Sequence, residues 1–196
     1  MLNTTTDYIL ENERVCLRPL RATDFTNLLP FSLNEPQIWT YSLISAASAE
    51  KLRFYIDLAI QQRTAQTQYP FIVFDKLANE YAGCTRFYDI NNSAKTALLG
   101  YTWYGTAYQG TGLNQACKAL LLEFGFEQCE FERIEFRADA QNERSVRALQ
   151  KIGCQIEGTL RNHLPSPLGG RRDTIVLSIL KHEWFNGIKQ LNWPIK

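Results

Sequence analysis

Short runs rich in hydrophobic residues divide much of this chain into strands, and at residues 14–20 hydrophobic and polar positions alternate. A polar segment at residues 76–80 fits a hairpin loop, and Asn91 with Asn92 fits a turn before the next strand. The predicted strands are residues 14–20, 70–75, 81–89, 96–104, 133–139, 154–160 and 173–180. The pattern therefore predicts about seven strands, and those of the first half follow one another as hairpins.

Apolar residues at helical spacing predict four helices between these strands. The first is short (24–33), Ser48 caps the second, and the others span 113–124 and 142–152, where Gly153 ends the last. The apolar side of the second helix carries Leu52, Tyr55, Ile56, Ala59 and Ile60. Only one strand–helix–strand unit follows the hairpins, so one parallel pair with a right-handed crossover is expected. This order predicts an α/β fold with a mixed sheet.

Composition then limits the possible functions. A chain of 196 residues without a linker or repeat fits a single domain over 1–196, and its net charge of +1 argues against nucleic acid as a partner. The sequence contains neither a signal-peptide pattern nor a long apolar run, which predicts a cytoplasmic protein without membrane contact. Its five cysteines are scattered, which favours a reducing compartment over a metal site: Cys16, Cys84, Cys117, Cys129 and Cys154.

Two glycines, Gly110 and Gly112, directly precede the third predicted helix. Unpaired amides and the positive end of a helix dipole meet at such a turn, and glycine lets the backbone approach an anion closely. The turn is a candidate phosphate cradle, with an ordinary surface turn as the alternative. No lysine follows as in a P-loop, and Gln115 stands where a dinucleotide fingerprint has its third glycine. Asp139 could mimic the ribose-binding acid of that fold, which keeps dinucleotide binding as a weaker alternative.

The residues from Gln109 to Asn114 resemble the Gln/Arg-x-x-Gly-x-Gly/Ala signature of GNAT-superfamily N-acetyltransferases. Residues 142–163 and 170–184 are similar to the second signature and the closing strand of the RimJ/RimL-like branch, which contains ribosomal-protein N-acetyltransferases. The resemblance implies a mostly antiparallel sheet with one splayed parallel pair and about four to five helices. It also implies acetyl-CoA as cosubstrate, no metal, and direct attack by an amine on the thioester. The pyrophosphate would be held by Gln109, Gly110, Thr111, Gly112, Leu113 and Asn114.

Further roles follow from the same resemblance. The backbone of Thr102, Trp103 and Tyr104 would pair with the pantetheine arm, although core packing is an alternative role for the two aromatic side chains. Asn142 would cap its helix and contact the pantetheine. Leu149 stands where many family members have a tyrosine as general acid, so Ser145 is a candidate donor to the departing sulfur.

His163 precedes a loop rich in proline and glycine and is a candidate base for the amine, or an ordinary surface histidine. Asp173 and Glu157 are weaker candidates, and His182 reads as a tail residue. Arg144, Arg147 and Lys151 could reach the phosphates or form a solvated face. Four aromatic residues are expected in the core, of which the first two could line an acceptor groove: Trp39, Tyr41, Phe54 and Tyr55.

The expected acceptor is a primary amine. Neutralising a lysine at pH 7.4 costs about 4 kcal/mol, against about 0.5 kcal/mol for an α-amine. A site with one candidate histidine therefore favours a protein N-terminus or a small amine of low pKa. A GNAT-fold module that binds acyl-CoA without transferring it is the alternative that Leu149 leaves open.

Overall fold

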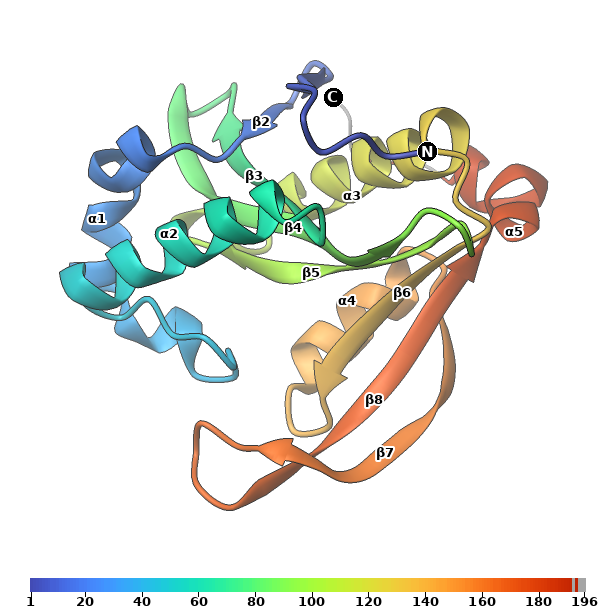
Figure 1. The fold of residues 1–196 in the computed structure, drawn as a ribbon. Coiled ribbons are helices and arrows are strands. Elements are labelled where there is room, and N and C mark those ends of the chain that lie inside the picture. Colours follow the sequence, from blue (N-terminus) through green and yellow to red (C-terminus); the bar gives the residue numbers. More distant parts are fainter. Residues whose placement is uncertain (192, 194–196) are drawn as a thin grey trace.

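The computed structural model describes residues 1–191 and 193, and within them eight strands form one mixed sheet (Figure 1). The strand order is β1-β2-β3-β4-β5-β6-β8-β7. The strands are β1 (Leu10–Glu11), β2 (Val15–Pro19), β3 (Gln68–Asp75), β4 (Glu80–Asn91), β5 (Thr96–Tyr104), β6 (Arg133–Asp139), β7 (Gln155–Pro165) and β8 (Arg171–Leu180). All neighbours are antiparallel except β5 and β6, which are parallel, so the predicted mixed sheet is confirmed.

The helices are α1 (Phe25–Asn34), α2 (Ala49–Thr64), α3 (Leu113–Glu123), α4 (Glu143–Lys151) and α5 (Lys181–Asn186). Two predicted caps are confirmed, since Ser48 Oγ accepts from Lys51 N and Asn142 Oδ1 accepts from Ser145 N, both at 3.1 Å. A hydroxyl or amide oxygen at this position satisfies an amide that the first turn leaves without a partner.

Helices cover both faces of the sheet (Figure 1). In β3, Phe71 and Val73 point into the core that α3 and α4 close, whereas Ile72 points into the core beneath α1 and α2. A strand buried on both faces needs apolar residues at consecutive positions, which accounts for the run 71–74. No helix in the described part of the chain is long and apolar enough to cross a membrane.

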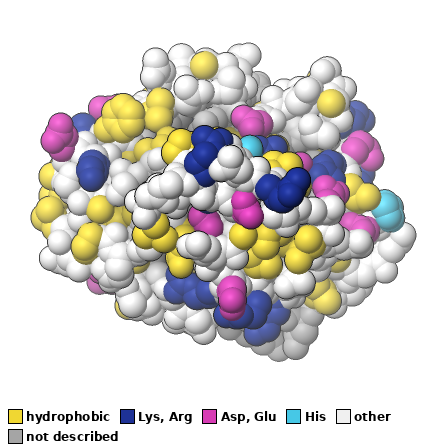
Figure 2. All heavy atoms as spheres, turned by 90° about the horizontal axis from the view of Figure 1, so that it is seen from below, with side chains coloured by type: hydrophobic (Ala, Val, Ile, Leu, Met, Phe, Trp, Pro, Cys, Tyr) yellow, Lys and Arg dark blue, Asp and Glu magenta, His cyan; other side chains and the backbone are white. Residues whose placement is uncertain are grey.

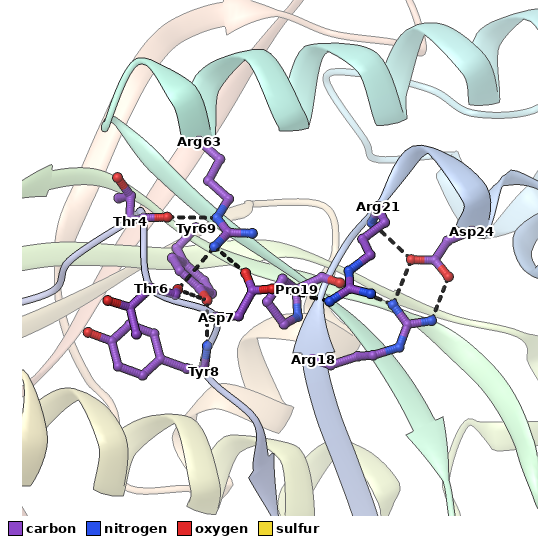
Figure 3. A network of polar contacts seen from close by, with 10 residues as sticks. All are labelled: Thr4, Thr6, Asp7, Tyr8, Arg18, Pro19, Arg21, Asp24, Arg63 and Tyr69. Atoms are coloured by element: carbon purple, nitrogen blue, oxygen red, sulfur yellow. Dashed lines mark hydrogen bonds and ion pairs between the residues drawn. The ribbon is translucent and has the colours of Figure 1, made fainter.

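Polar contacts fasten the N-terminal segment across α2 and β3 (Figure 3). Arg63 on α2 donates to the carbonyls of Thr4 and Thr6 and pairs with Asp7 at 2.7 Å. Tyr69 Oη donates to Thr6 O and accepts from Tyr8 N. These contacts therefore fix the segment before β1 to α2 and β3.

Arg18 on β2 holds the start of α1 in the same region (Figure 3). Its guanidinium donates to both carboxylate oxygens of Asp24, at 2.6 and 2.9 Å. Burial by itself would raise the pKa of Asp24, but the hydrogen bonds from Arg18, Arg21 N and Asn27, together with the charge of Arg18, lower that pKa.

The structure corrects three sequence predictions. β1 has only two residues, too few for a periodicity to show, and it raises the strand count from about seven to eight. β7 and β8 extend farther than predicted into the loop between them, so His163 lies within β7 rather than at its end. Phe54 is 61% exposed, because α2 directs Tyr55 and Ile56 toward the sheet instead.

β5 and β6 pair only where they begin. Their parallel register joins Thr96–Leu98 to Arg133–Glu135, after which the two strands separate. Beyond that point β5 pairs only with β4, and β6 pairs only with β8, through Asp139 opposite Thr174. Each strand therefore presents backbone N–H and C=O groups to the opening between them, as a free sheet edge does. We call this opening the fork.

Candidate active site

A cavity of about 670 Å³ occupies the fork. Its walls include the ends of both strands, residues 99–104 of β5 and 136–139 of β6, and the first turns of α3 and α4. The segment 37–44 and Arg172 of β8 line it as well. A cavity of this size between two unpaired strand edges can take an extended small molecule whose amide groups pair with the backbone.

The glycine turn forms one part of this cavity. Gly110 and Gly112 have φ angles of +76° and +88°, in the left-handed region where a side chain is strained. A Cβ built on Gly110 would meet nothing within 4 Å. The first hydrogen bond of α3 runs from Ala116 N to Gly112 O, so the amides of residues 112–115 have no intrahelical acceptor. Leu113 N makes a long contact of 3.4 Å with Thr111 Oγ1. The turn therefore presents backbone amides at the positive end of an 11-residue helix, as an anion site requires.

Arg144 and Gln109 extend the cradle across to α4. Gln109 Nε2 donates to Tyr104 O at 2.9 Å, and Gln109 Oε1 accepts from Arg144 Nη1. Thr111 also accepts a long contact of 3.4 Å from Arg14 Nη2, although Arg14 is paired with Asp75. A guanidinium held at the rim by a neutral amide keeps its positive charge available, which suits a phosphate.

The predicted cofactor residues are mostly in the cavity wall. Of the predicted set, nine line the cavity: Thr102, Trp103, Tyr104, Gln109, Gly110, Gly112, Asn114, Asn142 and Ser145. Thr111 is exposed in the turn beside it, and the side chain of Leu113 is buried in the core. The side chains of Trp103 and Tyr104 are also core, since Trp103 packs against Trp39 and donates to Tyr55 Oη at 3.3 Å.

A bulge in β5 faces the fork. Cys84 pairs with Trp103 and Arg86 with Gly100, so Tyr101 and Thr102 together stand opposite the single residue Thr85. Tyr101 has a φ of +50°, which is uncommon for a residue with a bulky side chain. An extra residue in one strand interrupts the ladder and bends the strand. The bulge therefore redirects β5 at the place where it leaves β6 and frees backbone groups there.

α4 contributes Asn142, Ser145 and Leu149 to the opposite wall. The cap occupies Asn142 Oδ1, so its Nδ2 is the part of the side chain that can donate to a ligand. Ser145 is half-buried one turn farther on. Leu149 is 9% exposed and offers only carbon atoms.

His163 does not line the cavity. Its Nδ1 lies 3.1 Å from Thr174 Oγ1, and the same hydroxyl accepts from Arg172 Nε at 3.2 Å. Arg172 lines the cavity and lies 3.8 Å from the carboxylate of Asp139, which is 4% exposed and also lines it. Among the described residues that line the cavity, Asp139 is thus the acidic one, and His163 is linked to it through the hydroxyl of Thr174 and the guanidinium of Arg172.

The weaker base candidates lie elsewhere. Hydrogen bonds from Arg133 lower the pKa of Glu157 to about 2, and neither Glu157 nor Asp173 lines the fork cavity. Asp173 Oδ1 accepts from Asn162 N at 2.7 Å. On α4, Arg144 and Lys151 line the cavity, whereas Arg147 is exposed and paired with Glu143.

Sequence reasoning missed Lys118 and gave Asp139 a different role. Both line the cavity and both are almost fully buried. Lys118 follows Cys117 on the apolar side of α3, and a lysine there interrupts an otherwise hydrophobic face. Lysine is rarely buried without a partner, so a lysine on the core-facing side of a predicted helix is a signal that the sequence does contain.

Charge in the cavity differs from charge on the surface. Of the charged side chains that line the cavity, five are cationic and Asp139 is the anionic one: Lys118, Arg137, Arg144, Lys151 and Arg172. Figure 2 shows basic, acidic and apolar side chains interspersed on the lower face of the molecule. Within the described residues, no group of three or more His, Cys, Asp or Glu side chains could hold a metal ion. Cationic residues therefore outnumber acidic ones in the lining of the cavity.

This chain matches a known protein family and is similar in sequence to several bacterial proteins. Residues 14–155 match the family described as acetyltransferase (GNAT) domain. YdaF of Bacillus subtilis (strain 168), a proposed ribosomal N-acetyltransferase, is 25% identical over 178 residues, covering 88% of this chain and 94% of its own. Spermidine N(1)-acetyltransferase of Escherichia coli (strain K12) is 25% identical over 119 residues, 61% of this chain and 62% of its own.

A solved structure shares the fold. A GCN5-related N-acetyltransferase from Brucella melitensis superimposes with a TM-score of 0.86 at 24% identity, over 96% of this chain and 85% of that one. The splayed β5–β6 pair and the glycine turn are features that the resemblance to this family implies, so the structure and the family match point to the same fold.

Proposed function

Because this chain belongs to the GNAT acetyltransferase family, we propose that it transfers an acetyl group from acetyl-CoA directly to a primary amine. The observation that carries the proposal is the fork, where the unpaired edges of β5 and β6 meet the open amides of the glycine turn in one cavity. Acetyl-CoA, a substrate consumed at each turnover, supplies an acyl group that is already activated as a thioester.

The residues in the wall suit the parts of acetyl-CoA. The amides of residues 112–115 and the Arg144 guanidinium suit the pyrophosphate. The fork-facing edge of β5 at Thr102–Tyr104 suits the two amides of the pantetheine arm, to which Asn142 Nδ2 can also donate. A backbone amide released at the Tyr101–Thr102 bulge is the candidate donor to the thioester oxygen as negative charge develops on it.

Two groups compete to receive the proton of the attacking amine. Asp139 is the better placed, because Asp139 lines the cavity and His163 does not. His163 would need a water molecule or its Thr174 contact as an intermediary. On the leaving-group side, we assign Ser145 as a hydrogen-bond donor to the sulfur.

Charge in the cavity favours an acceptor with a single amine. A polyamine brings several ammonium groups, yet the carboxylate that lines the cavity is Asp139, which lies beside Arg172. The attacking nitrogen of either acceptor must lose one proton, which costs about 0.5 kcal/mol at pH 7.4 for an α-amine and about 4 kcal/mol for an amine of pKa ~10.4. We therefore place a protein or peptide N-terminus ahead of spermidine as the acceptor class.

All five cysteines have free thiols. Free thiols are typical of proteins in a reducing compartment, so we propose the cytoplasm as the site of action.

The test is release of free CoA from acetyl-CoA in the presence of a panel of peptide and small-molecule amines. Turnover with any of them supports transfer. A protein that is stabilised by acetyl-CoA yet releases no CoA with any amine would be an acyl-CoA-binding module instead. Stabilisation by NAD without stabilisation by acetyl-CoA would indicate a dinucleotide-binding protein and contradict the proposal.

A further inference from the structure

A lysine ammonium is buried at the point where β5 and β6 separate. Lys118 projects from α3, is 3% exposed and lines the fork cavity. Its Nζ donates to Thr102 Oγ1 at 3.0 Å and lies 5.7 Å from the centre of the Phe136 ring. Thr102 belongs to the β5 bulge and Phe136 is the first residue of β6 beyond its pairing with β5. Lys118 is thus in contact with both arms of the fork.

No anion in the described residues balances this ammonium. The ionisable side chains that act on it are Cys117 and Cys154, and burial raises the pKa of both thiols to about 12, so both stay neutral. Thr85 and Thr102 add hydroxyl groups, which carry no charge. Burial lowers the pKa of Lys118 to about 8. An ammonium with three hydrogens and one observed acceptor can therefore donate to a ligand in the cavity.

The proposed reaction produces an anion in this cavity. Breaking the thioester leaves a thiolate, and neither Leu149 nor Ser145 can neutralise it, because leucine has no proton to give and a serine hydroxyl is too weak an acid. Building on the proposed function, we propose that Lys118 is the catalytic acid of this chain, delivering its proton to the departing sulfur where other family members use a tyrosine.

Bonds and protons balance in this step. The acceptor nitrogen forms a bond to the carbonyl carbon, and the carbon–sulfur bond breaks with its electron pair going to sulfur. Lys118 Nζ gives one proton to that sulfur and becomes a neutral amine, the form that burial favours. The proton lost by the acceptor nitrogen passes to Asp139 or water. Solvent then supplies a proton to Lys118 before the next turnover. A thiol of ordinary pKa ~8.5 is close to the lysine at about 8, so the transfer is nearly balanced.

Three variants separate proton transfer from charge alone. Lys118→Met keeps the length of the side chain without the proton, and Lys118→Arg keeps the charge but holds its protons tightly. The third combines Lys118→Met with Leu149→Tyr, which supplies a hydroxyl from the position used by the family. We expect kcat to fall about tenfold to a hundredfold in the methionine and arginine variants, with partial recovery in the double variant. A wild-type kcat in Lys118→Arg would show that charge suffices and overturn proton donation.

A measurement on bound CoA tests the contact without turnover. Thiolate absorbance in the ultraviolet gives the thiol pKa of CoA in its complex with the protein. With Lys118 beside the sulfur this pKa should lie below ~8.5, and Lys118→Met should raise it. Lys151→Met is the matched control, because it removes an exposed cavity lysine; it should weaken CoA binding but leave the thiol pKa unchanged.

The two readouts also separate this proposal from the proposed function. A folded Lys118→Met protein with an unchanged thiol pKa and unchanged kcat would refute the role of Lys118 while leaving acetyl transfer intact. If the wild-type protein acetylates no amine, the transferase function fails, yet the thiol titration still tells whether Lys118 lies beside the sulfur.

Discussion

Lys118 Nζ lies 3.0 Å from Thr102 Oγ1, and this contact joins α3 to β5 at the bulge that opens the fork. A hydroxyl that accepts from the ammonium must direct its own hydrogen elsewhere, and Thr85 Oγ1 is 2.8 Å away. Loss of the lysine proton allows the order of donors to reverse along this chain of three groups. The protonation state of one buried side chain is thereby coupled to the hydrogen bonding of two neighbouring strands.

The first prediction concerns the stability cost of this arrangement. The pKa of Lys118 falls from 10.5 to about 8 on folding, so the folded protein gives up the proton before the unfolded chain does. Stability therefore rises with pH between about 8 and 10.5 as this cost disappears. Below pH 8 Lys118→Met should stabilise the protein, on the order of 1–3 kcal/mol.

Paired melting curves at pH 7 and pH 10.5 check this expectation. The advantage of the methionine variant should be largest at pH 7 and nearly vanish at pH 10.5, with a shift of about 2–4 °C for each kcal/mol. If the variant is instead destabilised at pH 7, the hydrogen bond from Lys118 to Thr102 stabilises the folded protein by more than the burial of the ammonium destabilises it. Greater stability together with lower kcat would identify the residue as one retained for activity.

The second prediction concerns the glycine turn. Gly112→Val should abolish acetyl-CoA binding, because a branched side chain at φ +88° obstructs the amides that would hold the pyrophosphate. Gly169→Val is the matched control, since Gly169 has a similar φ of +96° and open space around it in the β7–β8 loop. Both variants should lose about 1–3 kcal/mol to backbone strain. Calorimetric titration should show that only Gly112→Val loses the ligand; equal binding by both would move the pyrophosphate elsewhere.

The glycine turn and its helix could be predicted because local chemistry specifies them. Gly110 and Gly112 need left-handed backbone, and Asn142 caps its own helix within three residues. Features that depend on a few neighbouring residues in this way can be predicted from one sequence. The same holds for β6, whose sequence alternates between polar and apolar residues although it pairs with β5 over only three residues.

Long-range relations could not be read in the same way. β1 pairs over two residues, and its existence depends on Leu17 lying opposite Leu10 in the finished sheet. The bulge that brings Thr102 to Lys118 is set by the register of β4 and β5, which no local pattern fixes. His163 was expected at the acceptor side from its place before a loop, but its distance from the cavity depends on how far β7 and β8 continue.

The third prediction compares the two proton acceptors. Asp139→Asn keeps the shape of the side chain and its contact with Gln141 N, but removes the negative charge, so kcat/KM should fall about a hundredfold. His163→Ala should lower it only a few-fold, since His163 is outside the cavity wall. Steady-state kinetics with acceptors of low and high pKa would check both. A larger loss in His163→Ala, growing with acceptor pKa, would instead make the histidine the base.

The fourth prediction concerns Ser145. Ser145→Ala should lower kcat about tenfold with little change in acetyl-CoA affinity, because its hydroxyl would stabilise the thiolate by one hydrogen bond. If Lys118 gives the proton to the same sulfur, the effects of Ser145→Ala and Lys118→Met should not be additive. A double-mutant cycle on kcat measures the coupling. Strictly additive losses would place the two side chains at different points of the reaction.

The last prediction concerns the acceptor. At pH 7.4 removing a proton from an α-amine is about 3.5 kcal/mol cheaper than from an amine of pKa ~10.4, which corresponds to a few hundredfold in rate if the site treats both alike. Cationic residues around the cavity add to this difference, because Arg137 and Arg172 repel the further ammonium groups of a polyamine. A short peptide with a free N-terminus should therefore exceed spermidine in kcat/KM by at least a hundredfold. The control is the same peptide with a blocked N-terminus and a free lysine, which should react as poorly as spermidine. Raising the pH to 9 should narrow the gap, since more of the basic amine is then neutral. Efficient acetylation of spermidine at pH 7.4, with no reaction at peptide N-termini, would reverse the assignment and require an acidic acceptor surface beyond Asp139.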